Sequence, residues 1–265
     1  MSECVGIIGV GNMGEALLAG LIASGQSTSQ ICITDKREDH AATLATQYGV
    51  AQKSLAEIGS DCKIILVVVK PQDLASTLES LKPNLGSRAL IVSFVAGKTI
   101  ASIEAILGGV HSVVRVMPNT PTLIGKGMAA VSPGTHSTPA CLSFVNNFLG
   151  ASGKVVEVEE RLQDAVTATS GSGPAYFFAF VEAMIAGAEK LGLSHEVATE
   201  LTVQTIIGAA GMLEQSGKDA KTLRENVTSP NGTTAAALAY FEASELSSIV
   251  AEAMAAAAKR SAELA

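Results

Sequence analysis

The sequence predicts an α/β fold, with a doubly wound parallel sheet in the first part of the chain and an all-α domain in the second. Continuous apolar strands alternate with helical segments up to about residue 160, a pattern typical of a parallel sheet covered by helices on both faces. After Glu160, no segment has the character of a strand and only helices are expected. These observations predict two domains, residues 1–160 and residues 161–265.

Five apolar strands are expected in the first domain. They are CVGIIGV at 4–10, ICITD at 31–35, CKIILVVV at 62–69, ALIVSFV at 89–95 and HSVVRVM at 111–117. The plainest helix between them is NMGEALLAGLIASG, because its apolar residues recur at helical spacing and Gly25 is placed to end it. A short strand near Val155 is expected to complete the sheet.

Long helices are expected in the second domain. They are RLQDAVTAT at 161–169, PAYFFAFVEAMIAGAEKLG at 174–192, HEVATELTVQTIIGAAGMLEQSG at 195–217 and a last helix from Thr233 that breaks near Ser244. The third carries no charge from Leu201 to Leu213, so it is apolar around most of its circumference. A domain of this size can hardly bury such a helix alone, and we expect an obligate homodimer in which a second subunit covers it.

Composition and charge restrict the partners of the protein. Its formal net charge is −7, and it has no cluster of Lys and Arg of the kind that binds a nucleic-acid backbone. No apolar run approaches the roughly 20 residues that a transmembrane helix needs, and the N-terminus lacks the basic region of a signal peptide. We therefore expect a cytoplasmic protein that binds neither nucleic acid nor membrane.

The four cysteines, Cys4, Cys32, Cys62 and Cys141, are scattered along the chain. They form no C-x-x-C pair and have no histidine at ligand spacing, unlike the usual pattern of a zinc site or a disulfide framework. We therefore expect no metal, and we interpret the cysteines as buried free thiols.

The segment GVGNMG supplies a G-x-G-x-x-G pattern between a predicted strand and a predicted helix. In this context Gly9 permits a tight turn, Gly11 lets the backbone approach a pyrophosphate, and Gly14 lets the helix pack closely on the strand. The free N–H groups and the helix dipole would hold the anion. The expected cofactor contacts of this turn are Gly9, Val10, Gly11, Asn12, Met13 and Gly14.

The end of the second strand gives conflicting signals about the cofactor. Asp35 stands where an acid would bond the 2′-hydroxyl of NAD and repel the 2′-phosphate of NADP. Lys36 and Arg37 follow at once and would pair with that phosphate. The alternative interpretation of these two basic residues is a solvated turn. The expected cofactor is NADP(H), with NAD(H) as the alternative.

Three further segments leave predicted strands at the same edge of the sheet. They are VVVKPQ, FVAGKT and the proline-stiffened loop RVMPNTP. Ligands of open α/β sheets bind outside the carboxyl ends of the strands, although Lys70 taken alone is equally consistent with a surface lysine. The expected cofactor contacts are Val69, Lys70, Pro71, Ala96, Gly97 and Asn119.

Two helix starts in the second domain are candidate sites. SGSGPAYFF has Pro174 at a natural first helical position beside Ser172 and Gly173. Its small residues leave space for a ligand at the helix start; the alternative is a simple break between two helices. TSPNGTT precedes an alanine-rich helix. Unpaired N–H groups at such a start suit a small carboxylate; the alternative is an ordinary N-cap at Thr228 or Ser229.

Taken together, GVGNMG, VKP, RVMPNTP, SGSGPAYFF and LRENVTSPNGTTAAAL resemble the pyrroline-5-carboxylate reductase family over nearly the whole chain. The resemblance implies a dinucleotide-binding Rossmann domain followed by an all-α dimerisation and substrate domain. It also implies interlocked homodimers, in many members joined into decamers. The implied activity is NAD(P)H-dependent hydride transfer to the C=N bond of 1-pyrroline-5-carboxylate, which gives L-proline in the last step of proline biosynthesis.

The resemblance also implies a substrate site for a small imino acid. Gly232, Thr233 and Thr234 would donate N–H groups to its carboxylate, and the hydroxyl of Thr234, the expected catalytic residue, would face the imine nitrogen. Ser229 and Pro230 would shape the turn. The expected substrate-binding residues are Ser172, Gly173, Pro174, Val227, Ser229, Gly232, Thr233 and Thr234.

Two positions depart from the family pattern. Asn231 replaces a common glycine, and little consequence is expected because Asn also tolerates left-handed backbone angles. Asp35 stands where relatives tend to have a small hydroxyl residue, which leaves the choice between NADPH and NADH open.

Two other functions fit part of the sequence. A β-hydroxyacid dehydrogenase shares the plan of the two domains, but it requires a lysine where this chain has Phe177, and a phenyl ring cannot transfer a proton. A non-catalytic nucleotide-binding regulator would need the glycine turn without the threonine pair at the far helix.

Overall fold

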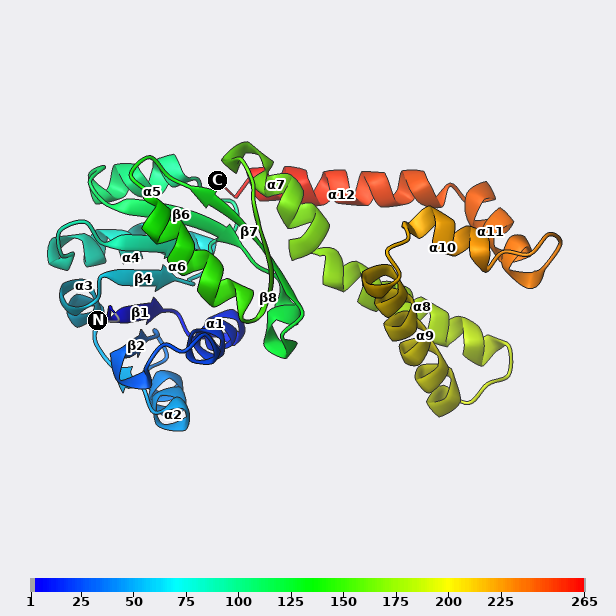
Figure 1. Cartoon of the computed structure of the whole chain (residues 1–265), viewed down its shortest axis with the longest axis horizontal. Helices are drawn as coiled ribbons and strands as arrows, with labels where there is room; N and C mark the ends of the chain where they lie inside the picture. The colour runs from blue at the N-terminus through cyan, green and yellow to red at the C-terminus, as the bar shows by residue number, and fades with distance from the viewer. Residues whose placement is uncertain (1–2, 265) are drawn as a thin grey trace. The chain divides into compact units, whose positions relative to one another are not determined.

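The computed structural model describes residues 3–264, which form two compact units. One unit comprises the chain up to Ser172 together with the residues from Ala256 onward, and the other comprises Gly173–Ala255. Figure 1 shows the sheet in the first unit and only helices in the second. The predicted architecture, a doubly wound sheet followed by helices, is therefore confirmed.

The first unit is built on an eight-stranded sheet with the order β3-β2-β1-β4-β5-β6-β7-β8. All neighbouring strands are parallel except β6 and β7, which are antiparallel. The strands are β1 Val5–Ile8, β2 Ile31–Thr34, β3 Ala51–Gln52, β4 Ile64–Val67, β5 Leu90–Ser93, β6 Ser112–Met117, β7 Gly127–Pro133 and β8 Gly153–Glu157.

Five predicted strands and the short one near Val155 are present, although most are shorter than expected. The sequence analysis missed β3, which has only two residues, and β7, whose sequence GMAAVSP is poor in β-branched residues. The expectation of an all-parallel sheet is wrong at β7. The connection from β6 to β7, residues 118–126, contains only the short 3₁₀ helix Thr120–Ile124, and a parallel crossover needs about a dozen residues or more.

Six short α-helices lie between the strands along the chain, and a seventh, α7, follows the last strand. They are α1 Asn12–Ala23, α2 Glu38–Tyr48, α3 Leu55–Asp61, α4 Leu74–Leu81, α5 Ile100–Leu107, α6 Pro139–Gly150 and α7 Gln163–Val166. A π-helical turn, Thr167–Gly171, follows α7. Local sequence explains several starts, since Ser54 forms a capping box with Glu57, and Thr99 and Thr138 cap α5 and α6.

Two apolar layers pack on the two faces of this sheet. On one face, Leu17 of α1, Leu44 of α2 and Phe148 of α6 are buried against the strands. On the other face, Leu78 of α4 and Ile103 of α5 are buried in the same way. This arrangement is the reason why the strands are apolar throughout rather than alternating.

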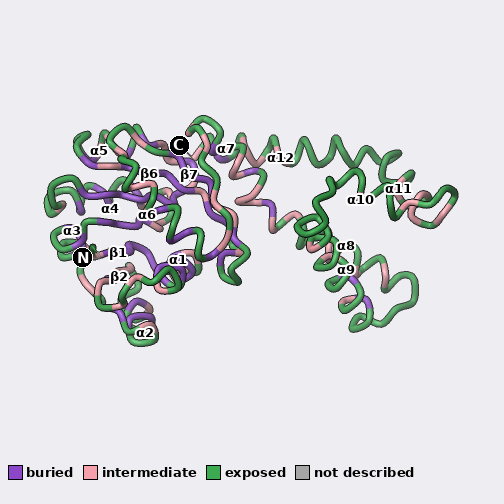
Figure 2. The backbone as a smooth tube through the Cα atoms, in the orientation of Figure 1, coloured by how far each residue is buried: buried purple, intermediate pink, exposed green. Residues whose placement is uncertain are grey.

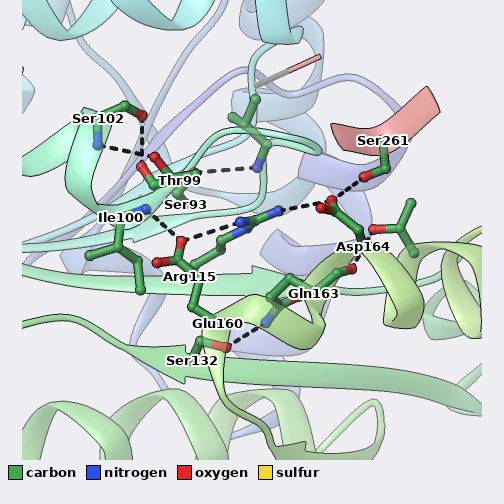
Figure 3. Close-up of polar contacts among 12 residues, drawn as sticks. Ser93, Thr99, Ile100, Ser102, Arg115, Ser132, Glu160, Gln163, Asp164 and Ser261 are labelled. Atoms are coloured by element: carbon green, nitrogen blue, oxygen red, sulfur yellow. Dashed lines mark hydrogen bonds and ion pairs between the residues drawn. The ribbon is translucent and has the colours of Figure 1, made fainter. Parts of the chain in front are cut away.

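A buried arginine joins several polar residues in the first unit (Figure 3). Arg115, at 5% exposure, forms an ion pair with Glu160 at 3.2 Å and lies 3.9 Å from Asp164. The hydroxyl of Ser261 donates to Asp164 at 2.7 Å, and the backbone N–H of Ile100 donates to Glu160 at 2.6 Å. The network therefore holds the end of the last helix, Leu246–Ala262, within the first unit.

The second unit consists of helices with little buried surface (Figure 2). They are α8 Gly173–Lys190, α9 His195–Gln215, α10 Ala220–Asn226, α11 Thr233–Ala243 and the first part of α12 Leu246–Ala262. The predicted break near Ser244 is confirmed, and Glu245 there has a φ of 56°. Among the described residues of α8 to α11, only Gly173, Ala198 and Thr202 are buried.

The cysteines are all free, but only two of them are buried as expected. Cys32 and Cys62 are buried, whereas Cys4 and Cys141 are half-buried. Within residues 3–264, no helix is long and apolar enough to cross a membrane.

Candidate active site

The glycine turn between β1 and α1 has the close contacts that the motif requires. Gly9 has a φ of 93°, and a Cβ there would lie 2.6 Å from the carbonyl oxygen of Val68. A Cβ at Gly14 would collide with the carbonyl of Gly9, so α1 packs directly on the turn. A Cβ at Gly11 would meet nothing within 4 Å. Gly11 is therefore open on the side where a ligand would approach.

A cleft of about 760 Å³ lies at the carboxyl ends of β1, β2 and β4. Seven of the predicted cofactor residues line it together, although they come from three separate segments of the sequence. They are Gly9, Gly11, Asp35, Lys36, Arg37, Val69 and Lys70. The expectation that these segments meet at one edge of the sheet is therefore supported by the geometry.

Several residues of the cleft were not predicted. Gln72 and Asp73 follow the Lys-Pro pair, and the hydroxyl side chains of Ser76, Thr77 and Ser80 come from α4. A signal for them exists in the sequence, because these polar residues recur at helical spacing opposite the apolar face of α4. They form the part of the cleft lining that comes from α4 and the residues just before it.

The other predicted cofactor residues do not line this cleft. Val10, Asn12, Met13, Gly14 and Pro71 lie in the turns and helix starts beside it, and Ala96, Gly97 and Asn119 follow β5 and β6.

Asn119 and Gly97 have structural contacts elsewhere in the first unit. The side-chain oxygen of Asn119 accepts the backbone N–H of Met128 at 2.8 Å. A Cβ at Gly97 would lie 2.6 Å from the Cβ of Leu264, and Gly97 has a φ of 77°. Here Gly97 allows the end of the chain to pack closely, and its contact with a cofactor stays a prediction.

Asp35 is oriented by the backbone of the glycine turn. Its two carboxylate oxygens accept the N–H groups of Val10 at 2.8 Å and Arg37 at 2.9 Å, and the guanidinium of Arg37 lies 3.5 Å away. Partial burial opposes ionisation, but these hydrogen bonds and the charge of Arg37 hold the pKa of Asp35 below its usual value. Asp35 is therefore an anion that stabilises the turn.

Lys36 is turned toward α4, where its amine lies 2.6 Å from the carboxylate of Asp73. The side chains of Lys36 and Arg37 are 73% and 65% exposed. Each of the two acids at this end of the cleft has a basic partner, and Lys70 adds a further positive charge among the lining residues. The charges around the cleft therefore favour an anionic ligand.

In the second unit, the TSPNGTT turn leaves the start of α11 without a side-chain cap. The N-cap residue is Gly232, and no side chain accepts a hydrogen bond from the first turn. The interpretation of Thr228 or Ser229 as an ordinary N-cap is therefore wrong. The hydroxyl of Thr228 instead donates to the carbonyl of Arg224 at 2.7 Å, and Asn231 has the left-handed φ of 59° that an asparagine tolerates.

One part of the predicted N–H set needs correction. The N–H of Gly232 donates to the carbonyl of Ser229 at 3.0 Å, so it closes the turn. The next N–H groups along α11 are those of Thr233 and Thr234, which come before the first helical hydrogen bond, from Ala236 to the carbonyl of Gly232. Thr233 is exposed and Thr234 is half-buried. A Cβ at Gly232 would crowd the turn, because it would lie 2.5 Å from the hydroxyl and 3.1 Å from the carbonyl oxygen of Ser229.

The other predicted substrate residues lie at the start of α8 and before α11. Gly173 is the first residue of α8, which makes Pro174 the second rather than the first. Ser172 ends the π-helical turn, and its N–H donates to the carbonyl of Thr167 at 2.8 Å. Val227 is 60% exposed.

Two family models match the chain. Residues 160–264 match the model described as "Pyrroline-5-carboxylate reductase dimerisation", and residues 4–97 match "NADP oxidoreductase coenzyme F420-dependent". The first match covers most of the helical part of the chain, and the second covers the first strands of the sheet and the glycine turn.

Relatives of known name match the whole chain. It is 42% identical to the pyrroline-5-carboxylate reductase of Pseudomonas aeruginosa, covering 98% of this chain and 96% of the relative. A pyrroline-5-carboxylate reductase structure from Coxiella burnetii matches 100% of this chain and 99% of the other, with a TM-score of 0.92 and 33% identity. The Plasmodium falciparum pyrroline carboxylate reductase with NADP bound matches 99% of this chain and 98% of the other, with a TM-score of 0.88 and 30% identity.

The sequence, the fold and the arrangement of the motifs all agree with these matches. The expected family is confirmed, and the β-hydroxyacid dehydrogenase alternative has no comparable support. The chain belongs to the pyrroline-5-carboxylate reductase family and is an oxidoreductase.

Proposed function

We propose that the protein reduces the C=N bond of 1-pyrroline-5-carboxylate to give L-proline, with NADPH as the hydride donor. The observation that carries this proposal is the uncapped start of α11 in the TSPNGTT turn, in a chain 42% identical over 98% of its length to a pyrroline-5-carboxylate reductase. The regulator alternative would not need such a turn.

The charges of the cleft support NADPH over NADH. Both oxygens of Asp35 accept backbone N–H groups, and Arg37 lies beside it, so this acid is less available to bond a ribose hydroxyl or to repel a phosphate. Lys36 and Arg37 are largely exposed at the same end of the cleft and suit a 2′-phosphate. The P. falciparum relative was solved with NADP bound.

The residues proposed to hold the cofactor are those of the cleft and its rim. The glycine turn would receive the pyrophosphate at the start of α1, since Gly11 has open space around it. We also propose that the cofactor contacts residues beside the cleft, namely Val10, Asn12, Met13, Gly14, Pro71, Ala96, Gly97 and Asn119.

The carboxylate of the substrate is proposed to bind at the start of α11. The N–H groups of Thr233 and Thr234 lack a side-chain cap, and the positive end of the helix dipole attracts an anion there. No arginine is needed for this recognition. Ser229 and Gly232 would shape the turn through their hydrogen bond, while Ser172, Gly173, Pro174 and Val227 are proposed to surround the ring.

NADPH, when bound, supplies the hydride, and the protein has to align the two reactants and stabilise the changing charge. The hydroxyl of Thr234 is proposed to donate a hydrogen bond to the ring nitrogen, where electron density gathers as the C=N bond is reduced. The segment Thr228–Thr234 contains no Asp, Glu, His or Lys. Within this turn, therefore, the polar groups that could face the reacting ring are hydroxyls, the side-chain amide of Asn231 and backbone groups.

The assembly is proposed to be a homodimer, with a decamer built from dimers as a further stage. Residues 161–265 would form the dimerisation and substrate domain, which agrees with the match of residues 160–264 to a dimerisation family. The exposed apolar side chains of α8 and α9, among them Phe177, Phe178 and Ile207, support a partner subunit on these helices. The cytoplasmic location stays a prediction from the sequence.

The activity is tested by following the absorbance of NADPH and of NADH with different acceptors. We expect steady oxidation of NADPH only when 1-pyrroline-5-carboxylate is added, with slower oxidation of NADH. Small oxo-acids serve as the control for a hydroxyacid dehydrogenase. Equal turnover of an oxo-acid, or no turnover with the imine, would contradict the proposal.

A further inference from the structure

Three cysteines that are far apart in the sequence lie together in the first unit. Cys4 precedes β1, Cys32 is the second residue of β2, and Cys62 is the C-cap of α3, just before β4. The sulfur of Cys4 lies 3.1 Å from that of Cys62 and 3.8 Å from that of Cys32. All three sulfurs lie within 4.8 Å of one another. We call this group the cysteine trio.

The topology of the sheet explains why the trio forms. β1 lies between β2 and β4 and is parallel to both, so Val5 pairs with Ile31 and with Ile64. The residues that begin these three strands therefore meet at one edge. The sequence analysis expected no such site, because the spacing of the cysteines along the chain does not show which strands are neighbours.

A glycine leaves the space that the sulfurs occupy. Gly6 on β1 pairs with Cys32, and a Cβ at Gly6 would lie 3.2 Å from the sulfur of Cys62 and would collide with Ile58. A larger residue would push Cys62 away from its neighbours. The absence of a side chain at Gly6 therefore permits the approach of Cys62 to Cys4.

The trio lies at the amino ends of β1 and β4, whereas the cleft lies at their carboxyl ends. A ligand bound by the trio would not contact the nucleotide or the imine. Its effect would fall on the stability of the first unit, since it would join segments that begin three neighbouring strands.

We propose that the cysteine trio binds a thiophilic divalent cation, represented by Zn²⁺. A donor set made only of sulfur selects such ions and excludes Mg²⁺ and Ca²⁺. Zinc held by thiolates at about 2.3 Å in a tetrahedral site places the sulfurs about 3.8 Å apart. The distance of 3.8 Å between Cys4 and Cys32 meets this value, and the 3.1 Å between Cys4 and Cys62 has to widen by less than about 1 Å.

Charge favours a divalent over a monovalent cation. Three thiolates with Zn²⁺ leave one net negative charge, and the amine of Lys53 is near enough to interact with Cys4 and Cys32. Three thiolates with a monovalent cation would instead leave two net negative charges. Lys53 would compensate these poorly, because its amine also pairs with Asp61 at 2.6 Å. Among the described residues, no histidine or carboxylate joins the trio. A water molecule on the half-buried side of Cys4 would complete four ligands.

Burial raises the pKa of Cys32 and of Cys62, and the neighbouring sulfur of Cys4 raises both further. Thiols in this condition are poor nucleophiles. A thiophilic cation instead displaces their protons and gains three ligands that are already close together.

The proposal is tested by titrating the reduced full-length protein with Zn²⁺ in the absence of oxygen, against a chromophoric chelator of nanomolar affinity. We expect one tightly bound Zn²⁺ per chain and a rise in the melting temperature on binding. Cys4→Ser should weaken binding at least about 100-fold, more than the 10- to 100-fold typical of a lost outer-shell partner. Cys141→Ser is the matched control, because Cys141 lies on α6 outside the trio, and its affinity should equal that of the parent.

Co²⁺ provides a second readout that does not depend on affinity. The parent and Cys141→Ser should show thiolate-to-cobalt charge-transfer absorption, which Cys4→Ser and Cys32→Ser should lose in large part. Cys4 is half-buried, so Cys4→Ser is expected to remain folded without metal. Cooperative thermal unfolding of the metal-free variant tests this. The proposal is overturned by the absence of stoichiometric Zn²⁺ binding, by binding that survives Cys4→Ser, by binding that Cys141→Ser removes, or by binding of Cu⁺ alone.

Discussion

The two compact units of this chain bury their apolar residues to very different extents. The first has two apolar layers on the faces of a sheet, and many of their side chains are fully buried. In the second, Phe178 of α8, Ile207 of α9 and Tyr240 of α11 are 63%, 57% and 75% exposed. Both units contain long apolar segments, so the difference indicates that the first completes its core within one chain, whereas the second leaves apolar surface that suits another chain.

The largest expected effect comes from placing a charge on the exposed apolar surface of the second unit. Ile207→Glu would put a carboxylate into the proposed subunit interface, and the cost of burying it is about 3–5 kcal/mol, equivalent to a 100-fold or greater loss of dimer affinity. Light scattering and sedimentation measure this loss. Val110→Glu is the matched control, since Val110 is 61% exposed in the first unit.

The Ile207→Glu variant also tests whether the first unit binds the cofactor without a partner subunit. If the cleft is complete within the first unit, as its lining residues indicate, the Ile207→Glu monomer should still bind NADPH within about threefold of the parent, because none of its contacts is lost. A dimer that persists in Ile207→Glu, or one that Val110→Glu disrupts equally, would remove the distinction between the two units.

Next in size is the loss of the proposed catalytic hydroxyl in the second unit. Thr234→Ala keeps the backbone N–H and removes only the side-chain donor, so kcat/KM for 1-pyrroline-5-carboxylate should fall roughly 10- to 1,000-fold. Steady-state kinetics give the value, and Thr46→Ala, an exposed threonine of α2 whose hydroxyl bonds the carbonyl of Ala42, is the control. An unchanged kcat/KM in Thr234→Ala dismisses the catalytic role of this hydroxyl.

A smaller effect is expected in the cleft of the first unit. Arg37→Ala removes a largely exposed guanidinium near the proposed 2′-phosphate site, so NADPH affinity should fall about tenfold, as one charge-assisted hydrogen bond contributes about 1.5 kcal/mol. NADH affinity should change much less, because NADH has no 2′-phosphate. Fluorescence titration of the two nucleotides measures both, and an equal loss for NADH would argue against this placement of the phosphate.

The smallest effect concerns local stability. Ser54→Ala removes the capping box of α3 in the first unit and should lower the free energy of unfolding by about 1 kcal/mol. Ser194 caps α9 in the second unit through the N–H of Val197. If the comparison is right, the melting temperature of Ser54→Ala should be shifted equally at all protein concentrations, whereas that of Ser194→Ala should depend on concentration as the dimer dissociates.

Much of the fold could be predicted because its signals are local. The apolar runs from Ile31 and from Ile64 each fit a buried parallel strand, and the glycine turn has a strict spacing. β7 escaped prediction because its sequence is poor in β-branched residues, and its antiparallel direction depends on the short connection from β6. No single segment of the sequence shows which strands are neighbours in the sheet. The cysteine trio could therefore not be predicted from the sequence.

In the candidate site, too, local sequence predicts some features, whereas others depend on the three-dimensional arrangement. Asp35 and Arg37 were identified by their distance from the glycine turn, but the sequence could not show that Asp35 accepts the N–H of Val10. The uncapped start of α11 was expected from TSPNGTT, whereas the use of the Gly232 N–H inside the turn depends on backbone geometry. Ser76, Thr77 and Ser80 were missed because their role becomes visible only when the fold brings α4 to the cleft that the end of β2 also lines.

The central claim is that the N–H groups at the start of α11 bind the carboxylate of the imino acid. It is tested most directly by a crystal structure of the protein with NADP⁺ and L-proline, the proposed product. The account predicts the proline carboxylate within hydrogen-bonding distance of the N–H groups of Thr233 and Thr234, with the ring beside the nicotinamide. A proline whose carboxylate binds elsewhere, with these N–H groups facing only solvent, would contradict it.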